Sequence, residues 1–319
     1  MREKRYECDL HCHTTRSDGS DTPQELILNA EKAGVKVLAV TDHDVRPPEN
    51  ITVFSENRTD IQKVKISAYA AEHGIFLLRG IEISCETEVE DVHIVCFGCD
   101  WDDGFFRELE ESVVASKING YKELVRRLTD NGMPVTWEEI LENAGNPVKE
   151  EQIQKKMIFE LMARKGYVSD WSKAKILVKE DKRFQVRRKK PDPVRVIQEI
   201  HRCGGICILA HPFLISDEIR TATGKTDRKT YIEKLTDAGL DGIEACYTYS
   251  KTSYAGKHSD EEIEAYVRKE YTDRLRIISG GSDYHADHKK GVKNARRLGE
   301  SGITYQEFIE NPLLSSLRG

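Results

Sequence analysis

The chain has 319 residues, of which 38% are hydrophobic and 33% are charged, and its formal net charge is −6. This composition is ordinary for a globular enzyme, and the small negative charge argues against a general polyanion-binding protein. No apolar stretch approaches the roughly 20 residues that cross a bilayer, and residues 1–10 lack the apolar segment of a secretory signal. We therefore expect a cytoplasmic protein with one large domain, or one domain that carries an insertion.

Apolar runs and amphipathic patterns alternate over the first hundred residues. The apolar runs predict strands over 6–10, 35–40, 75–84 and 92–98, and the amphipathic patterns predict helices over 23–33 and 61–73. Thr22 and Pro23 supply the cap and the first position of the earlier helix, and Gly34 ends it.

Residues 102–190 have a different character, because charged and helix-forming residues replace the strand signals. Helices are expected over 104–131, 137–143, 152–165 and 171–179. The segment ends in a basic run, 182–190, with six cations in nine residues. We interpret 102–190 as a helical insertion, and the basic run as either a solvated connection or an electrostatic guide for a nucleotide or a short RNA end.

The alternation of strands and helices returns after Pro191. Helices are expected over 193–202, 231–238 and 260–271, and strands over 206–210, 240–247 and 275–279. The chain then has seven short apolar strands whose runs are continuous, which favours parallel strands covered on both sides. This pattern predicts an α/β barrel or a doubly wound sheet.

Side chains that bind metals recur at the strands, mostly where a strand ends. His11 and His13 are two residues apart on an extended segment, so both imidazoles face the same side, while Cys12 between them faces the other. The other candidates are Asp18, His43, Glu82, His93, His211, Glu244, Asp283 and His285. Reactive groups of α/β barrels gather at the C-terminal ends of the strands, so these side chains are expected to meet.

Several of these residues stand apart from the pattern. His93 lies early in its strand, unlike the others. Glu244 is either a ligand or a partner that orients a ligand histidine.

The eight cysteines are irregularly spaced in mostly apolar segments and are interpreted as buried, reduced thiols. Cys96 and Cys99 form a single C-x-x-C pair, which is weak evidence for zinc.

Six motifs together resemble the PHP (polymerase and histidinol phosphatase) family of metallo-phosphoesterases. They are His11-Cys12-His13 with Ser17-Asp18-Gly19, Thr41-Asp42-His43, Gly80-Ile81-Glu82, His93, Ala210-His211-Pro212, and Gly281-Ser282-Asp283-Tyr284-His285. The resemblance implies a distorted seven-stranded (β/α)7 barrel. It also implies a branch with a helical insertion, similar to nucleotide 3′,5′-bisphosphate phosphatases. Residues 1–101 and 191–319 would form the barrel, and 102–190 would cover the active site.

The resemblance also implies how the ligands are shared among two or three divalent ions. His11, His13, Glu82 and Asp283 would hold one ion; Glu82, His93 and His211 would hold a second; and Asp18, His43 and His285 would hold a third. Imidazole and carboxylate ligands suit zinc, manganese or iron, and the sequence does not choose among them.

Charge arithmetic is consistent with phosphoester chemistry. Three carboxylates, three divalent ions and a bridging hydroxide leave a net positive site, which suits the negative charge of a phosphoryl group. The hypothesis is hydrolysis of phosphomonoesters of small metabolites, most simply nucleotides or short RNA ends, by a metal-bound hydroxide without a protein nucleophile. Arg16, Lys155 and Lys156 are candidate contacts to the phosphate.

Two other functions remain open at this stage. An amidohydrolase that cleaves carbon–nitrogen bonds also uses His-x-His on a barrel, but no lysine follows a strand in a position to bridge two metals. A non-catalytic, metal-stabilised binding module would need fewer ligands than the sequence offers.

Overall fold

The computed structural model describes residues 5–55, 61–86, 88–143, 149–222 and 224–318. The chain divides into two compact units, one of residues 1–107 with 191–319 and one of residues 108–190. The sequence placed the first boundary at 101. In the structure the first unit extends to residue 107. Phe106 packs against Trp101 of this unit, with ring centroids 4.9 Å apart.

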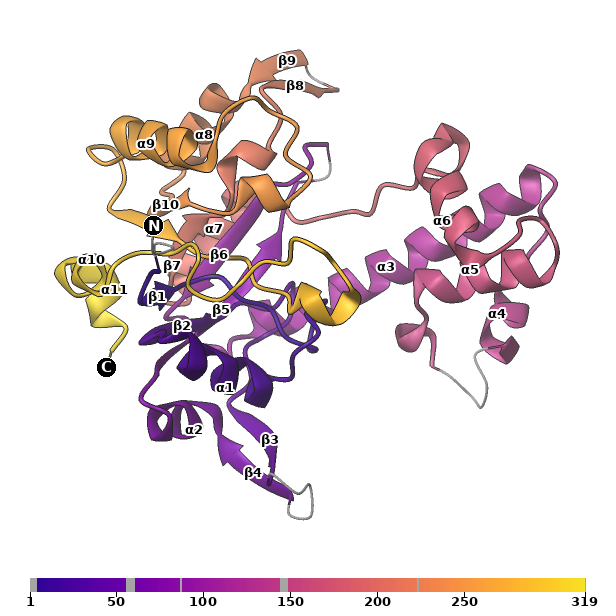
Figure 1. Cartoon of the computed structure of the whole chain (residues 1–319). Helices are drawn as coiled ribbons and strands as arrows, with labels where there is room; N and C mark the ends of the chain where they lie inside the picture. The colour runs from indigo at the N-terminus through magenta and orange to yellow at the C-terminus, as the bar shows by residue number, and fades with distance from the viewer. Residues whose placement is uncertain (1–4, 56–60, 87, 144–148, 223, 319) are drawn as a thin grey trace. The chain divides into compact units, whose positions relative to one another are not determined.

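The first unit is built around a seven-stranded sheet (Figure 1). Its strands, in spatial order, are β1 (Cys8–Asp9), β2 (Val37–Val40), β5 (Phe76–Ser84), β6 (His93–Phe97), β7 (Ile206–Leu209), β10 (Gly242–Cys246) and β11 (Ile277–Gly280). The backbone N–H of Leu10 donates to the carbonyl of Gly280 at 3.3 Å, which joins the first strand to the last. The sheet is therefore a nearly closed barrel, and the predicted mixed α/β fold class is confirmed.

One strand departs from the expected parallel arrangement. β6 runs antiparallel to both neighbours, with Ser84 opposite His93 on one side and Leu209 opposite Ile94 on the other. The other adjacent pairs in the sheet are parallel. A continuous apolar run indicates burial on both faces and carries no information about strand direction, so the sequence could not show this reversal.

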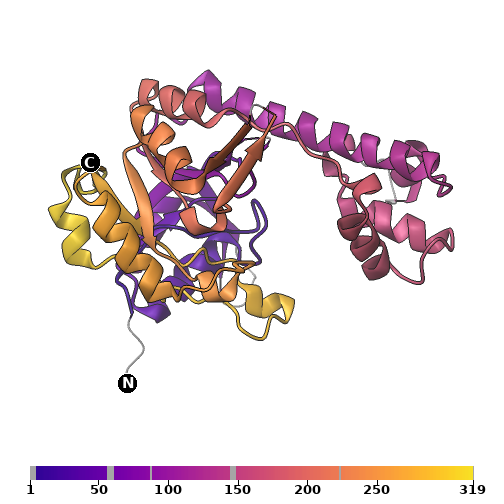
Figure 2. The ribbon, with the colours of Figure 1, turned by 90° about the horizontal axis from the view of Figure 1, so that it is seen from above.

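Helices and two small hairpins surround the sheet (Figure 2). The helices of this unit are α1 (Pro23–Ala33), α2 (Ile66–Glu72), α7 (Pro193–Arg202), α8 (Arg228–Asp237), α9 (Asp260–Tyr271), α10 (Tyr305–Glu310) and α11 (Pro312–Ser316). The hairpins are β3 (Asn50–Phe54) with β4 (Ile61–Lys65), and β8 (Glu218–Thr221) with β9 (Gly224–Asp227). The predicted helix over 61–73 is wrong in its first five residues, because Ile61–Lys65 pairs with β3.

The caps of α1 agree with the sequence signals. Thr22 accepts from the N–H of Glu25, whose side chain accepts from the N–H of Thr22, and Gly34 ends the helix with φ of 79°. A left-handed backbone at this position favours glycine. The buried face of α1 packs with α2 and the barrel wall in one apolar cluster that includes Leu26, Leu38 and Ile66.

The helical insertion, residues 108–190, has its own apolar core. It contains most of α3 (Gly104–Asp130), with α4 (Trp137–Asn143), α5 (Lys155–Arg164) and α6 (Trp171–Glu180). Leu128, Ile158, Met162 and Phe184 are nearly inaccessible to solvent within it. Among the described residues no helix has the length and apolar character needed to cross a bilayer.

Candidate metal centre

The extended segment after β1 presents His11 and His13 to the same side. It pairs with the segment after β11, since the N–H of His13 donates to the carbonyl of Tyr284 at 2.8 Å. Cys12 pairs with Tyr284 as a bridge and packs with Leu26 and Leu38 in the apolar cluster under α1. Alternation along the strand therefore separates the two imidazoles from the thiol. All eight cysteines are buried and free, as expected.

The carboxylate of Glu82 lies among five imidazoles. Its Oε2 atom lies 3.1 Å from a nitrogen of each of three rings, those of His11, His13 and His43. Its Oε1 atom lies 2.9 Å from Nδ1 of His93 and 3.0 Å from Nε2 of His211. Burial raises the pKa of Glu82, but the surrounding imidazoles hold the pKa well below its usual value, so the group is ionised.

Asp283 approaches the same imidazoles with one oxygen only. Its Oδ1 lies 3.0 Å from Nε2 of His13 and 3.6 Å from Nε2 of His11. Its Oδ2 accepts from the Tyr247 hydroxyl at 2.7 Å and from Nη1 of Arg296 at 2.5 Å. Asp283 also has a left-handed backbone, with φ of 50°. Strain of this kind is typical of functional sites, and here it turns the carboxylate into the cluster.

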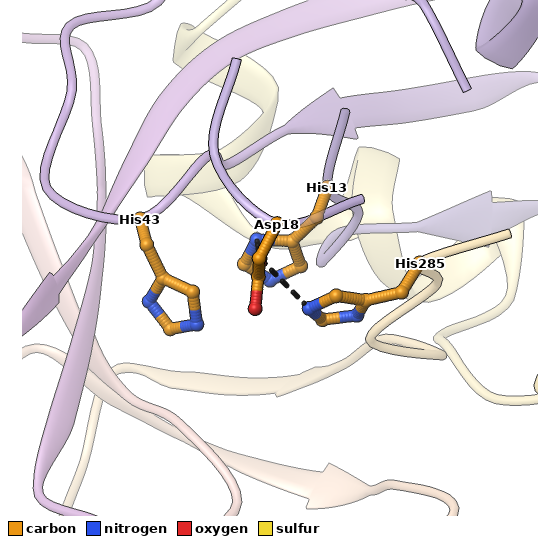
Figure 3. Close-up of side chains that lie close together, drawn as sticks. All are labelled: His13, Asp18, His43 and His285. Carbon is orange, nitrogen blue, oxygen red and sulfur yellow. Dashed lines mark ion pairs between the residues drawn. The ribbon is translucent and has the colours of Figure 1, made fainter. Parts of the chain in front are cut away.

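A second group surrounds the exposed side chain of Asp18 (Figure 3). Oδ1 of Asp18 lies 3.0 Å from Nε2 of His285 and 3.7 Å from Nδ1 of His13. The rings of His13 and His285 are stacked with centroids 4.1 Å apart, and the ring centroid of His43 is 4.6 Å from that of His13. Nδ1 of His285 donates to the carbonyl of Asp283 at 2.8 Å, so Nε2 is the ring nitrogen that could bind a metal ion beside Asp18.

Eight of the nine predicted ligands, all but His211, fall into three overlapping groups within which the ligand atoms lie within 4.8 Å of one another. The groups are His11, His13, Glu82 and Asp283; His13, Asp18, His43 and His285; and His43, Glu82 and His93. His13, His43 and Glu82 each belong to two groups. The groups are therefore close enough to share ligands, as two-metal and three-metal sites do.

Unpartnered atoms show that this donor set suits metal ions. Among the described residues, eight buried side-chain atoms lack a hydrogen-bond partner, and six of them belong to this cluster. They are His11 Nε2, His13 Nδ1 and Nε2, His43 Nδ1, Glu82 Oε2 and His211 Nδ1. Buried polar atoms without partners are costly. Three imidazole nitrogens, Nε2 of His11, Nε2 of His13 and Nδ1 of His43, gather at 3.1 Å around Oε2 of Glu82 without hydrogen-bond geometry, and a donor set of this kind fits a bound divalent cation.

Glu244 orients two of the histidines from behind. Its Oε1 accepts from Nδ1 of His11 at 3.0 Å, and its Oε2 accepts from the backbone N–H of His211 at 2.7 Å. His211 has φ of 30°, and this hydrogen bond holds the unusual backbone in place. Of the two roles left open for Glu244, the geometry supports that of an orienting partner, because both of its oxygens already accept hydrogen bonds.

Two further buried carboxylates brace the loops that carry the ligands. Asp42 accepts from the N–H and hydroxyl of Thr14, each at 2.7 Å, and from the Ser17 hydroxyl at 2.7 Å. Asp9 accepts from the N–H and hydroxyl of Ser282 at 2.9 and 2.6 Å. These bonds fix the loop before Asp18 and the turn before Asp283.

The sequence did not single out Tyr247 or Arg296. Both contact Asp283, and both line a cavity of about 290 Å³ over the cluster, which we call the metal cavity. Its lining includes His43, Glu82, His93, His211, Asp283 and His285. Tyr247 lies just beyond β10, the strand that carries Glu244. Its place at the end of a strand was the sequence signal that could have identified it as a site residue. Arg296 lies in a loop with no motif.

Of the predicted phosphate contacts, Arg16 belongs to the barrel and does not line the metal cavity, whereas Lys155 and Lys156 belong to the other unit. Arg16 is exposed, and its Nη2 donates to the carbonyl of Arg46 at 2.9 Å. Lys155 and Lys156 begin α5 in the helical insertion, and Lys156 pairs with Glu160 at 3.5 Å. The assignment of these three residues to the phosphate stays a prediction.

A fourth potential metal group, His201, Cys207 and Asp241, lies apart from the cluster. Asp241 accepts from Nε2 of His201 and from the N–H of Cys207, each at 2.8 Å, and pairs with Arg276. These hydrogen bonds satisfy the carboxylate, so we interpret the group as structural.

Known proteins resemble both the sequence and the fold. A 5′-3′ exoribonuclease of Haemophilus influenzae is 30% identical over 242 residues, which cover 76% of this chain and 78% of the relative. A 3′,5′-nucleoside bisphosphate phosphatase of Chromobacterium violaceum is 25% identical over 89% of this chain and 88% of its own length. A phosphoribosyl 1,2-cyclic phosphate 1,2-diphosphodiesterase of Eggerthella lenta is 27% identical over 87% and 93%.

Solved structures share the fold. A protein of Bifidobacterium adolescentis described as a metal-dependent phosphoesterase superposes with a TM-score of 0.63 and 23% identity, covering 98% of this chain and 96% of that one. The PHP domain family matches residues 9–178, which contain the motifs from His11 to His93. This match, together with the exoribonuclease relative, shows that the chain belongs to the PHP family of metal-dependent phosphoesterases.

Proposed function

We propose that this phosphoesterase removes phosphate from small phosphorylated metabolites, and that its preferred substrates are nucleotides such as nucleoside 3′,5′-bisphosphates or the ends of short RNAs. The observation that carries the proposal is the set of unpartnered imidazole and carboxylate atoms in the cluster around Glu82, a residue that lines the metal cavity. The names of the three relatives, which act on nucleotides, RNA or a ribosyl phosphate, support the substrate class.

In this proposal the nine predicted ligands hold two or three divalent ions of zinc, manganese or iron. His11, His13, Glu82 and Asp283 serve one ion, and Glu82 with His93 and His211 serves a second. Asp18, His43 and His285 serve a third. Bound ions would activate water and offset the negative charge of a phosphoryl group.

The protein groups around the ligands hold them in one geometry. Glu244 keeps the proton of His11 on Nδ1, so that Nε2 points into the cluster. Arg296 and Tyr247 hold Oδ2 of Asp283, so that only Oδ1 faces His11 and His13. A fixed donor set of this kind lowers the cost of organising the site during reaction.

An adjoining cavity gives room for a leaving group larger than phosphate. It has a volume of about 600 Å³ and shares Asp91, Leu214 and Ser253 with the metal cavity. Phe213 forms part of its wall, with the Arg228 guanidinium 3.8 Å from the ring centroid. Pockets of about 300 to 1,000 Å³ hold ligands of nucleotide size. This supports a nucleotide over a smaller phosphoester.

Phosphate release from a panel of substrates tests the proposal. The metal-stripped protein is reloaded separately with zinc, manganese or iron, and offered a nucleoside 3′,5′-bisphosphate, a nucleoside 5′-monophosphate and a 5′-phosphorylated trinucleotide. We expect hydrolysis of at least one, with loss in His13→Ala and Asp283→Ala. Cleavage of amides without phosphate release would establish the amidohydrolase alternative. Metal binding without turnover of any phosphoester or amide would indicate a binding module.

A further inference from the structure

Lys251 is a largely buried cation on the wall of the metal cavity. Its Nζ lies 2.5 Å from Oε2 of Glu300 and donates to the carbonyl of Ala295 at 3.1 Å. A lysine ammonium group has three N–H donors. Within the part of the chain that the structure describes, two of these donors are therefore used, and one N–H of Lys251 has no protein partner.

The backbone around Lys251 and its carboxylate partner are both held in place. Lys251 ends a short 3₁₀ turn, and the preceding Ser250 donates to Asp260 through its N–H at 2.9 Å and through its hydroxyl at 2.7 Å. Glu300 is fixed as well, because its Oε1 accepts from the backbone N–H of Arg297 at 2.8 Å. The ammonium group is therefore positioned by the fold rather than free in solvent.

The segment that carries Lys251 borders both cavities of the barrel. Lys251 and Ser253 line the metal cavity, and Ser253 also lines the adjoining cavity of about 600 Å³. A nucleotide with its phosphoryl group at the metal ligands and its nucleoside in the adjoining cavity has the bond that breaks between the two. The segment 251–253 lies at this junction.

Other proton donors that line the metal cavity, apart from the predicted ligands, are less suited to acid catalysis. The Tyr247 hydroxyl donates to Asp283, and Arg296 carries a guanidinium, which does not lose its proton in proteins. The two aliphatic hydroxyls that follow Lys251 are no more acidic than the sugar alcohol that leaves. Lys251 is therefore the remaining candidate for an acid among these described donors.

The leaving group of a nucleotide is a sugar alcohol, which without an acid departs as a strongly basic alkoxide. A positioned acid that protonates such an oxygen accelerates a reaction by about 100- to 10,000-fold. Lysine ammonium groups are stronger acids than sugar alcohols, so the proton moves to the oxygen once the bond has broken. A fixed lysine with an unused N–H has the chemistry that this step needs.

We propose that Lys251 is the general acid that protonates the leaving oxygen. The phosphorus–oxygen bond breaks, its electron pair remains on the sugar oxygen, and this oxygen takes a proton from Nζ. Water gives phosphorus its new oxygen, and the proton that this water loses restores the ammonium group before the next turnover. Glu300 is the positioning residue that holds Nζ. The proposal rests on the proposed phosphoesterase function, since it concerns the same reaction.

Substrates with a bridging sulfur test the proposal in the full-length, metal-loaded protein. Adenosine 3′,5′-bisphosphate is compared with its analogues in which sulfur replaces the bridging 3′ or the bridging 5′ oxygen, because a thiolate leaves without a proton. Lys251→Arg keeps the positive charge but cannot give up a proton. We expect this variant to lower kcat for the oxygen ester by about 100- to 10,000-fold, and to stay within about threefold of the parent for the analogue with sulfur in the cleaved bond.

A binding measurement and a control variant separate acid catalysis from the effect of charge alone. Inorganic phosphate, titrated by calorimetry, should bind to Lys251→Arg as tightly as to the parent, and the metal content should be unchanged. Lys229→Arg, at an exposed lysine that pairs with Glu270 in the same unit, is the control and should behave like the parent with both kinds of ester.

The outcomes distinguish this proposal from the proposed function. Equal losses of Lys251→Arg with the oxygen and sulfur esters, or no loss with either, overturn the role of Lys251 while the phosphoesterase function stands. A parent protein that releases phosphate from no ester overturns both. Should Lys251→Arg lose its metal, Glu300→Gln provides the second test, because it keeps the lysine and removes only its charged partner; it should slow the oxygen ester more than the sulfur ester, and equal slowing overturns the proposal.

Discussion

Nδ1 of His93, at the first residue of β6, lies 2.9 Å from Oε1 of Glu82, near the end of β5. The two residues meet because β6 is antiparallel, so its beginning lies beside the ends of β5 and β7. The carbonyl of His93 also accepts from the N–H of Ala210, the residue before His211. A ligand that begins its strand thus reaches the same rim of the barrel as ligands that follow theirs.

The contacts of Glu82 predict that metal binding fails without its charge. Glu82→Gln keeps the size of the side chain but removes the anion that faces five imidazoles. We expect the metal affinity to fall by more than the roughly 10- to 100-fold that is typical for loss of an orienting partner. The metal content per chain, measured by elemental mass spectrometry, should therefore drop.

Thermal unfolding gives an independent readout of the same variant. Manganese at 100 times its Kd should stabilise the parent protein by about 2.7 kcal/mol and should leave Glu82→Gln nearly unchanged. Glu199→Gln, in an exposed pair with Arg202, is the control and should behave like the parent. Equal stabilisation of the parent and Glu82→Gln by the metal would contradict the central position of Glu82.

Glu244 is predicted to act on metal affinity through His11. Glu244→Gln leaves one oxygen for the two hydrogen bonds that Glu244 now accepts, so the His11 ring or the His211 backbone loses its partner. We expect metal affinity to fall about 10- to 100-fold, while activity at saturating metal recovers largely. An activity loss that excess metal does not restore would instead place Glu244 among the direct ligands.

The positions of the candidate ligands could be predicted where a local sequence pattern, such as strand alternation or a strand end, determines them. His11 and His13 share a face because a strand alternates, and His43, His211 and Asp283 follow strands that end at one rim of the barrel. The place of His93 could not be derived, because the direction of β6 depends on pairing between distant segments. Arg296 could not be found either, since its loop reaches Asp283 through the tertiary fold.

The hairpin of β3 and β4 shows a second limit of predicting structure from the sequence. The sequence predicts one helix over 61–73, but the helix α2 covers only Ile66–Glu72, and Ile61–Lys65 pairs as a strand with Asn50–Phe54. Local propensity is a weak guide where a partner strand supplies backbone hydrogen bonds.

Two groups that hold Asp283 predict a graded series of variants. Tyr247→Phe removes a neutral hydroxyl from Oδ2, whereas Arg296→Gln removes a charged donor. A neutral hydrogen bond contributes about 0.5 to 1.5 kcal/mol and one to a charged group about 1.5 to 3 kcal/mol. We therefore expect metal affinity, measured by calorimetry, to fall about 2- to 10-fold in the first variant and about 10- to 100-fold in the second.

The order of the two losses is the informative part of that series. Because Arg296 lies on the wall of the metal cavity, its variant can also raise KM. Comparing calorimetry without substrate and kinetics with saturating metal separates the two effects. A larger loss for Tyr247→Phe than for Arg296→Gln would show that the arginine does not hold the carboxylate in solution.

The close contact between Gly281 and His11 predicts that a single methyl group disrupts the centre. A Cβ at position 281 would lie 2.3 Å from Cβ of His11 and 2.6 Å from its backbone nitrogen. Neither atom can move without shifting the strand that carries His11 and His13. Gly281→Ala is expected to cost about 1 to 3 kcal/mol of stability and to lower metal content, as measured by denaturant unfolding and elemental mass spectrometry. Gly104→Ala is the matched control, because a Cβ there meets only the tip of Arg107 at 3.8 Å. If both variants kept the parental stability and metal content, the close packing of the two extended segments would not be required to position the imidazoles.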